Sequence, residues 1–145
     1  MKSPAAHAAL AGRLRPALLR VSRQVRREAQ RLGVSALDAQ LLAMIAKEEG
    51  AGVSALARSE QMSAPTMSAH VRRLEAAGWI ARRALRGDRR RIGLAITPAG
   101  RQALEDIRRL RSDWLAERLA GLSAAEIEAL RAALPALERL AGDST

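Results

Sequence analysis

The arginines between residues 63 and 91 carry the clearest chemistry in this sequence. Arg72 and Arg73 follow one another, and the segment Arg86-Gly87-Asp88-Arg89-Arg90-Arg91 is almost entirely charged. A guanidinium group can bind a phosphate, or the edge of a guanine base, through two parallel hydrogen bonds. We therefore expect this region to bind duplex DNA, although a merely solvated helix face would also explain Arg72 and Arg73.

The charge of the whole chain supports an anionic partner. The net charge is +10 over 145 residues, and it is concentrated in two regions. Residues 1–34 contain eight basic residues against one acidic residue, and residues 51–100 contain nine against three. Such a surface suits either nucleic acid or an anionic membrane. No segment approaches the roughly 18 consecutive apolar residues of a membrane span, so we expect DNA and no membrane partner.

The residue types that the chain lacks exclude several other functions. There is no cysteine, which excludes disulfides, thiolate catalysis and thiol redox sensing. His7 and His70 are the only histidines, and neither lies at a spacing typical of metal ligands. Because there is also no glycine-rich phosphate loop, we expect no enzyme, no cofactor and no metal site. The first ten residues lack the apolar core of a signal peptide, which favours a cytoplasmic protein.

A helix-turn-helix is predicted to hold the first group of arginines. A short helix at Ala55–Glu60, with Ser54 as its N-cap, is followed by a turn at Gln61-Met62. Ser63 then caps a second helix, whose buried stripe we expect to be Met67, Val71 and Leu74 and which should end at Gly78. Its opposite face carries small and polar residues, as a helix in the major groove requires.

A hairpin is predicted to hold the second group. The strands Trp79–Arg83 and Arg91–Ile96 flank the charged tip, and the second strand alternates apolar and small residues. Arginine at such a tip suits a narrow minor groove, whose negative potential attracts it. Asp88 is a poor DNA ligand, and we expect it to hold an arginine side chain by a bidentate ion pair. The alternative is an ordinary solvated turn.

Together the helix and the hairpin give one set of residues expected to bind DNA. Ser63 can serve both as cap and as phosphate ligand, since a helix N-terminus attracts phosphate. For His70 a packing role on the flank of the helix is the alternative to a DNA contact. The expected DNA-binding residues are Ser63, Ala64, Pro65, Thr66, Ser68, Ala69, His70, Arg72, Arg73, Arg86, Asp88, Arg89 and Arg90.

Amphipathic helices flank this region on both sides. Helices are expected at about 6–31, 36–49, 98–120 and 124–141, and Ser35 and Ser123 begin possible capping boxes. We expect a mainly α fold of one domain (residues 1–145), with a winged helix-turn-helix lobe at 35–99. The helices at 6–32 and 98–141 expose more apolar surface than that lobe can cover. A homodimer is therefore expected, and a monomeric helical bundle is the alternative.

Specific motifs then resemble those of a known family. The segments LEAAGWIARR (Leu74–Arg83) and GDRRRIGLAITPAG (Gly87–Gly100) are similar to the MarR (multiple antibiotic resistance regulator) family of winged-helix transcription factors. The matching features are Leu74-Glu75, Gly78-Trp79, Asp88-Arg89-Arg90 and Ile96-Thr97-Pro98-Ala99-Gly100. The resemblance implies an obligate homodimer on a pseudo-palindromic operator, with Arg90 in the minor groove and Asp88 bracing the wing.

The resemblance also implies a function. Many family members release DNA when they bind a small aromatic ligand, but the ligand-binding residues of this chain are unknown from its sequence. We expect a homodimeric, sequence-specific repressor whose DNA binding a small molecule modulates. The alternatives are an architectural, nucleoid-associated protein of low sequence specificity, and an adaptor that has kept the fold but lost DNA binding. The pair Asp88 and Arg90 argues against the adaptor.

Overall fold

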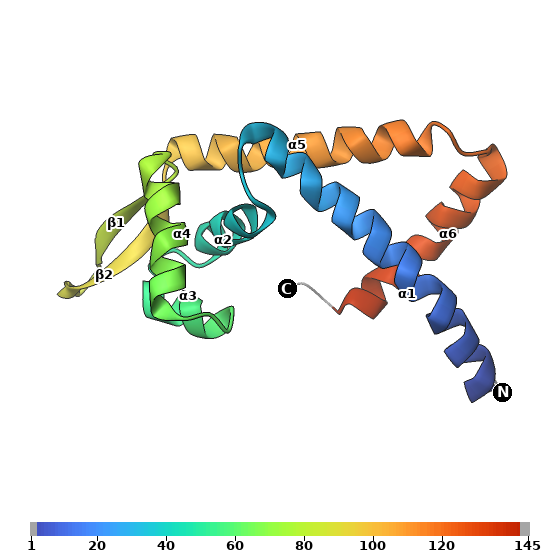
Figure 1. The fold of residues 1–145 in the computed structure, drawn as a ribbon, viewed down its shortest axis with the longest axis horizontal. Coiled ribbons are helices and arrows are strands. Elements are labelled where there is room, and N and C mark those ends of the chain that lie inside the picture. Colours follow the sequence, from blue (N-terminus) through green and yellow to red (C-terminus); the bar gives the residue numbers. More distant parts are fainter. Residues whose placement is uncertain (1–2, 143–145) are drawn as a thin grey trace. The chain divides into compact units, whose positions relative to one another are not determined.

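Helices and one hairpin follow each other in the order that the sequence predicts. The computed structural model describes residues 3–142, except for the side chain of Arg89. Its elements (Figure 1) are α1 (Pro4–Arg27), the 3₁₀-helix η1 (Glu28–Leu32), α2 (Ala36–Lys47), α3 (Val53–Ser59), α4 (Ala64–Ala76), β1 (Ile80–Leu85), β2 (Asp88–Ile96), α5 (Pro98–Leu119) and α6 (Ala124–Ala141). The expected fold class, mainly α with a two-stranded antiparallel wing, is confirmed.

The chain divides into two compact units. Residues 1–111 form the first, and residues 112–145 form the second, so that α5 begins in one unit and ends in the other. The division into a lobe at 35–99 and dimerisation helices on either side stays a prediction. Within residues 3–142, no helix is both long enough and apolar enough to cross a bilayer.

Several element boundaries differ from those expected. The first helix ends at Arg27, where the backbone tightens into η1. Helix α3 begins at Val53 with Gly52 as its N-cap, instead of at Ala55, because glycine accepts the extended cap conformation and the earlier start lets Val53 pack on the core. The strands of the wing extend further toward the tip than expected, because backbone pairing continues through Ala84 with Ile92 and Leu85 with Asp88.

An aliphatic core holds α2, α4 and the wing together. The largest fully buried side chains are Leu41, Leu42 and Ile45 of α2, Met67, Val71 and Leu74 of α4, Leu94 of β2 and Ile107 of α5. Burying each of these contributes about 1.5–3 kcal/mol. The expected stripe of α4 is therefore confirmed as its buried face.

The base of the wing is fixed to the loop between α2 and α3. The Gly50 N–H donates to the Leu94 carbonyl at 2.8 Å, and the Leu94 N–H donates to the Ala51 carbonyl at 2.9 Å. The loop at Gly50 and Ala51 thus pairs with β2 along the edge that faces away from β1. Gly93 permits this approach, since a Cβ placed there would lie 2.3 Å from the Gly50 carbonyl oxygen. The orientation of the wing consequently depends on a position that has no room for a side chain.

We expect Gly93→Ala to destabilise the first unit. The added methyl collides with backbone that cannot rotate away, so the pairing of Gly50 with Leu94 must open, at a cost of about 1–3 kcal/mol. Thermal unfolding followed by circular dichroism measures the loss. The control is Gly12→Ala in α1, where nothing lies within 4 Å, and which should raise stability by up to about 1 kcal/mol. If Gly93→Ala and the unchanged protein unfolded at the same temperature, the close approach of Gly50 to Gly93 would not be required for stability.

Candidate nucleic-acid interface

Helices α3 and α4 form the expected helix-turn-helix, in which α4 has the position of the recognition helix. Ser63 is its N-cap, and the Ser63 Oγ accepts a hydrogen bond from the Thr66 N–H at 3.3 Å. The Ser63 and Thr66 hydroxyls also lie 2.7 Å apart. Pro65 stands in the first turn, where its missing N–H has no intrahelical partner to lose. The backbone N–H groups of this exposed helix start suit a phosphate.

The face of α4 opposite its buried stripe is open to solvent. Ala64, Pro65, Thr66, Arg72 and Arg73 are exposed, and Ser68, Ala69 and His70 are partly buried. The side chains near the helix N-terminus are small, so the backbone of α4 can come close to another surface. This is the geometry that a helix needs in a major groove.

Arg72 is the freest cation on this face. Its Nε donates to the Ser68 carbonyl of the same helix at 3.4 Å, which is a long and local contact. It forms no ion pair with the acidic side chains that the structure describes. Its guanidinium group is therefore available to an external anion.

Arg73 and His70 are instead engaged by Asp38 of α2. The Asp38 Oδ1 lies 2.7 Å from the His70 Nδ1, and Arg73 donates through Nε to Oδ2 at 3.2 Å and through Nη2 to Oδ1 at 3.3 Å. The Arg73 Nη2 also contacts the His70 Nδ1. Three side chains from two helices thus meet at one carboxylate.

The environment of Asp38 keeps it ionised. Burial raises the pKa of Asp38, but the hydrogen bonds from Arg73, His70 and Ser35 and the Arg73 charge outweigh it, so that the pKa lies below its ordinary value. The sequence predicted a capping box at Ser35, of which only half is present: the Ser35 Oγ accepts from the Asp38 N–H at 3.0 Å. The Asp38 side chain binds α4, because His70 and Arg73 offer a stronger, charge-assisted interaction. No local pattern reveals partners more than 30 residues away.

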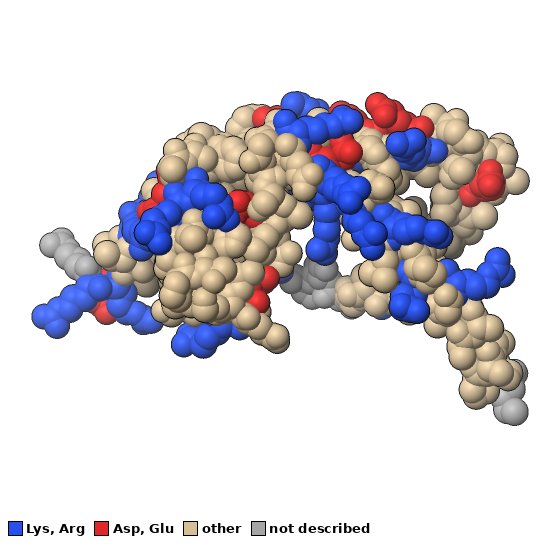
Figure 2. Space-filling model, viewed as in Figure 1, with Lys and Arg blue, Asp and Glu red and all other residues tan. Residues whose placement is uncertain are grey.

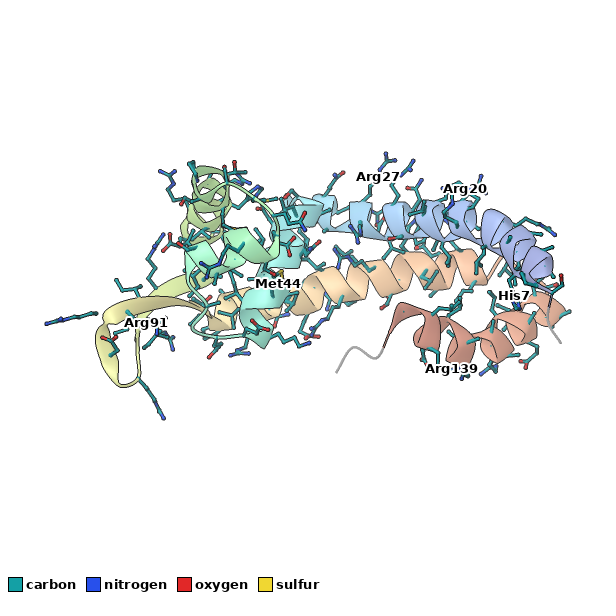
Figure 3. The ribbon with its side chains drawn as sticks, turned by 90° about the horizontal axis from the view of Figure 1, so that it is seen from below. His7, Arg20, Arg27, Met44, Arg91 and Arg139 are labelled. Carbon is teal, nitrogen blue, oxygen red and sulfur yellow. The ribbon has the colours of Figure 1, made fainter. Side chains whose placement is uncertain are left out.

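The tip of the wing presents arginine to solvent. Gly87 has a φ of 88°, which the turn requires and which glycine adopts without strain. The side chains of Arg86 and Arg90 are exposed, and that of Arg89 lies outside the described residues. Arg91 was not among the residues expected to bind DNA, yet it is equally exposed beside the tip (Figure 3). Its place in the same charged run was the available signal.

Asp88 braces the wing in a different way from the expected one. Its Oδ1 accepts a hydrogen bond from the Arg90 backbone N–H at 3.0 Å. Among the side chains that the structure describes, it pairs with no arginine guanidinium. The reason is geometric, since a short aspartate reaches an N–H two residues ahead more easily than the end of a long, solvated side chain. The carboxylate therefore shapes the turn, and the exposed Arg86 and Arg90 side chains form no ion pair among the described residues.

The electrostatic character of the first unit follows from these contacts. Figure 2 shows Lys and Arg side chains gathered over α4 and the wing, with few acidic side chains between them. Of the acids that lie here, Glu75 is held by Arg82 at 2.9 Å, and Asp88 accepts the Arg90 backbone N–H. The region is thus a positive surface made by a helix and a hairpin that one core holds together.

A cleft of about 470 Å³ opens elsewhere in the first unit. Small and apolar residues and one amide form most of its wall, including Met44 (Figure 3), and Arg26, Lys47 and Arg111 add positive charge. Burial, and then the Arg26 guanidinium, lower the pKa of Arg111. The Arg111 Nε is buried and has no hydrogen-bond partner within residues 3–142. The cleft has no acidic lining residue, so it suits an anion.

The described residues offer no set of ligands for a metal centre. Across the residues that the structure describes, no group of three or more His, Asp or Glu side chains could hold a metal ion. Both candidate sites therefore depend on arginine, a donor of hydrogen bonds to anions.

Comparison with known sequences agrees with the geometry. Residues 34–92, which span the helix-turn-helix and most of the wing, match the MarR family. An uncharacterized HTH-type transcriptional regulator of Mycobacterium bovis is 32% identical over 137 residues, which cover 94% of this chain and 96% of that protein. An HTH-type transcriptional regulator of Mycobacterium tuberculosis matches to the same extent.

Solved structures extend the comparison to the fold. A candidate transcriptional regulator from Pseudomonas aeruginosa has a TM-score of 0.79 and 32% identity, covering 99% of this chain and all of that one. A point mutant of MepR from Staphylococcus aureus, bound to an oligodeoxyribonucleotide, has a TM-score of 0.69 and 20% identity, covering 88% of this chain and 94% of that one. The recognition helix, the wing and these relatives lead to one conclusion: the chain belongs to the MarR family of winged helix-turn-helix transcriptional regulators.

Proposed function

We propose that this regulator is a homodimeric repressor that binds a pseudo-palindromic operator in double-stranded DNA. The observation that carries the proposal is the pairing of an open recognition-helix face with an arginine-rich wing tip on one rigid core. The DNA-bound MepR relative supports the use of this fold on DNA. A bacterial repressor of this kind acts in the cytoplasm, where its operator lies.

The two elements have different tasks in this proposal. The N-terminal half of α4 enters the major groove, where Ala64, Pro65, Ser68 and Ala69 allow close approach and Arg72 binds a base or a phosphate. Ser63 and Thr66 at the helix start bind phosphate. The wing enters the adjacent minor groove through Arg90, with Arg86 and Arg89 beside it and Asp88 holding the turn.

We expect Arg90→Ala to weaken operator binding by at least about tenfold, equivalent to about 1.4 kcal/mol. The side chain is exposed and unpaired within the described residues, so its loss should leave the unfolding temperature unchanged. Fluorescence anisotropy with a labelled operator duplex measures the affinity. Arg131→Ala removes an exposed arginine from α6 and should bind as the unchanged protein does. Equal affinities for Arg90→Ala and Arg131→Ala would refute the role of the wing.

An architectural role of low specificity is the second candidate, and the net charge of +10 favours it. The same assay separates the two functions when an unlabelled random duplex competes with the operator at physiological salt. A repressor should prefer its operator by a factor of about 10³ or more, because base contacts add to phosphate contacts. An architectural protein should bind the random duplex and the operator with similar affinity.

The dimer is proposed from surfaces that this chain leaves uncovered. Neither α1 nor α6 has a buried residue within its described length. Leucine and valine side chains line one side of α1, while Arg20 and Arg27 lie together on another side (Figure 3). Along α6, Leu130, Leu134 and Leu140 are exposed, the last by 73%. A second copy of the chain would cover these apolar faces, and it would also supply the second half-site contact.

We expect Leu134→Glu to convert the dimer to a monomer and to abolish tight operator binding. Leu134 is 52% exposed in the single chain, so the charge is tolerated in the monomer but costs several kcal/mol when an interface buries it. Sedimentation equilibrium measures the molar mass. Ala132→Glu adds the same charge on the opposite side of α6 and should remain dimeric. If Leu134→Glu stayed dimeric as well, the α6 face would not be the interface.

The cleft lined by Arg26 and Arg111 is proposed as the site of the modulating ligand. Two guanidinium groups approach each other there without an acid, and the Arg111 Nε lacks a partner. A small organic anion would offset the repulsion between the two guanidinium groups and would accept a hydrogen bond from the Arg111 Nε. Its apolar part would lie against the alanines and Met44. Because α2 lines this cleft and also contacts α4, an occupant can influence the recognition helix.

Benzoate and its uncharged counterpart benzamide test this site. We expect millimolar benzoate to raise the unfolding temperature by mass action and to weaken operator binding, and benzamide to do neither. Arg111→Gln should abolish both effects of benzoate, and Arg26→Gln serves as a second variant if the first folds poorly. An equal response to the two compounds, or an unchanged response in both variants, would show that the arginines bind no anion.

A further inference from the structure

The carboxylate of Asp38 is the point at which α2 and the recognition helix are joined by directional bonds. Asp38 is 7% exposed, and it receives hydrogen bonds from His70 and from both ends of the Arg73 fork. Elsewhere α4 packs on its neighbours through apolar side chains, and Glu75 pairs with Arg82 of β1 at 2.9 Å. Aliphatic packing fixes the distance between two helices more firmly than their rotation, because it is not directional.

The chemistry of the cluster fixes the proton on His70. An ionised carboxylate only accepts hydrogen bonds, so the His70 Nδ1 carries hydrogen when it binds the Asp38 Oδ1 at 2.7 Å. The contact of the Arg73 Nη2 with the same nitrogen is then not a hydrogen bond, because both groups are donors. The Nε2 makes no hydrogen bond within the described residues and is not among the buried unpartnered atoms. His70 therefore donates inward to α2, and its ring is held on the flank of α4.

The Arg73 guanidinium is committed in the same way. Its Nε and Nη2 both point at the Asp38 carboxylate, in the bidentate arrangement that a phosphate would otherwise occupy. Transfer of Arg73 to a DNA phosphate would leave a buried carboxylate with one partner fewer, which is costly. Arg72, one residue earlier, has no such commitment.

We infer that Asp38, His70 and Arg73 are positioning residues that set the rotation of the recognition helix, and that Arg73 does not bind DNA. The inference rests on the proposed DNA binding and deepens it, because it divides two adjacent arginines between two roles. Arg72 contacts the duplex, whereas Arg73 and His70 act through Asp38. Of the residues that the sequence marks as DNA ligands, these two are thereby assigned to the support of the helix.

The salt dependence of operator binding separates the two roles. Each lost phosphate contact lowers the slope of log K against log salt by about 0.9, and a dimer loses two. Arg72→Gln should therefore bind more weakly, with a slope smaller by about 1.8 if Arg72 binds phosphate and an unchanged slope but relaxed sequence preference if it binds a base. Arg73→Gln should bind about tenfold more weakly with the slope of the unchanged protein. A slope reduced by about 1.8 in Arg73→Gln would make Arg73 a phosphate ligand and overturn the inference.

A double-mutant cycle on operator affinity tests the coupling to Asp38. Asp38→Asn keeps the size of the side chain but places an amide N–H₂ group against the donors of α4. If both residues act through one contact, Asp38→Asn/Arg73→Gln should bind no more weakly than the worse single variant. Losses that add in the double variant would refute the coupling. Circular dichroism at the assay temperature shows that each variant is folded.

Nitrogen-15 NMR of histidine tests the cluster without DNA. His7→Gln leaves His70 as the one histidine of the chain, and its Nδ1 should show the shift of a protonated nitrogen at pH 8. Asp38→Asn in the His7→Gln background should remove the preference for hydrogen on the Nδ1 of His70. A spectrum with hydrogen on Nε2 alone would overturn the cluster. Failure of operator binding in the unchanged protein, with the expected NMR result, would count against the repressor and not against the cluster.

Discussion

The packing of α4 against α2 and the wing is the interaction on which the rest of the structure depends. The chain has no phenylalanine or tyrosine, so this contact is made mainly by leucine, isoleucine, valine and methionine side chains, at helical spacing in α2 and α4 and alternating in the wing. Once Met67, Val71 and Leu74 are buried, the helix can present only its opposite face to solvent. The chemistry available to DNA is consequently decided by which residues remain outside the apolar stripe.

Directional contacts then refine what aliphatic packing leaves free. The Ser63 cap fixes the start of α4, and the pairing of Gly50 with Leu94 fixes the base of the wing. Asp38 adds a charged link between α2 and α4, and Asp88 shapes the tip through a backbone N–H. In each case a polar group close to the interface is used for orientation, and Arg72 and Arg90 remain without an ion pair among the described residues.

Two parts of the molecule remain unsatisfied within the described residues of the single chain. The apolar faces of α1 and α6 are exposed, although water is a poor environment for them. In the cleft, Arg26 and Arg111 repel each other, with no acidic side chain in its lining. These are different costs, one of exposed apolar surface and one of uncompensated charge, and they suit different partners. A second copy of the chain fits the first, and a small anion fits the second.

The sequence alone determined the order of the elements, the buried stripe of α4, the charged wing and the family, because these depend on periodicity, capping and turn residues close together in the chain. It placed the cap of α3 incorrectly, and it revealed neither the hydrogen bond of Asp88 to the Arg90 backbone N–H nor the role of Asp38. Tertiary structure decided those points. The partners of Asp38 lie more than 30 residues away, and Arg26 of α1 lies near Arg111 of α5. Which charged groups meet depends on how the helices pack, and no local pattern records that.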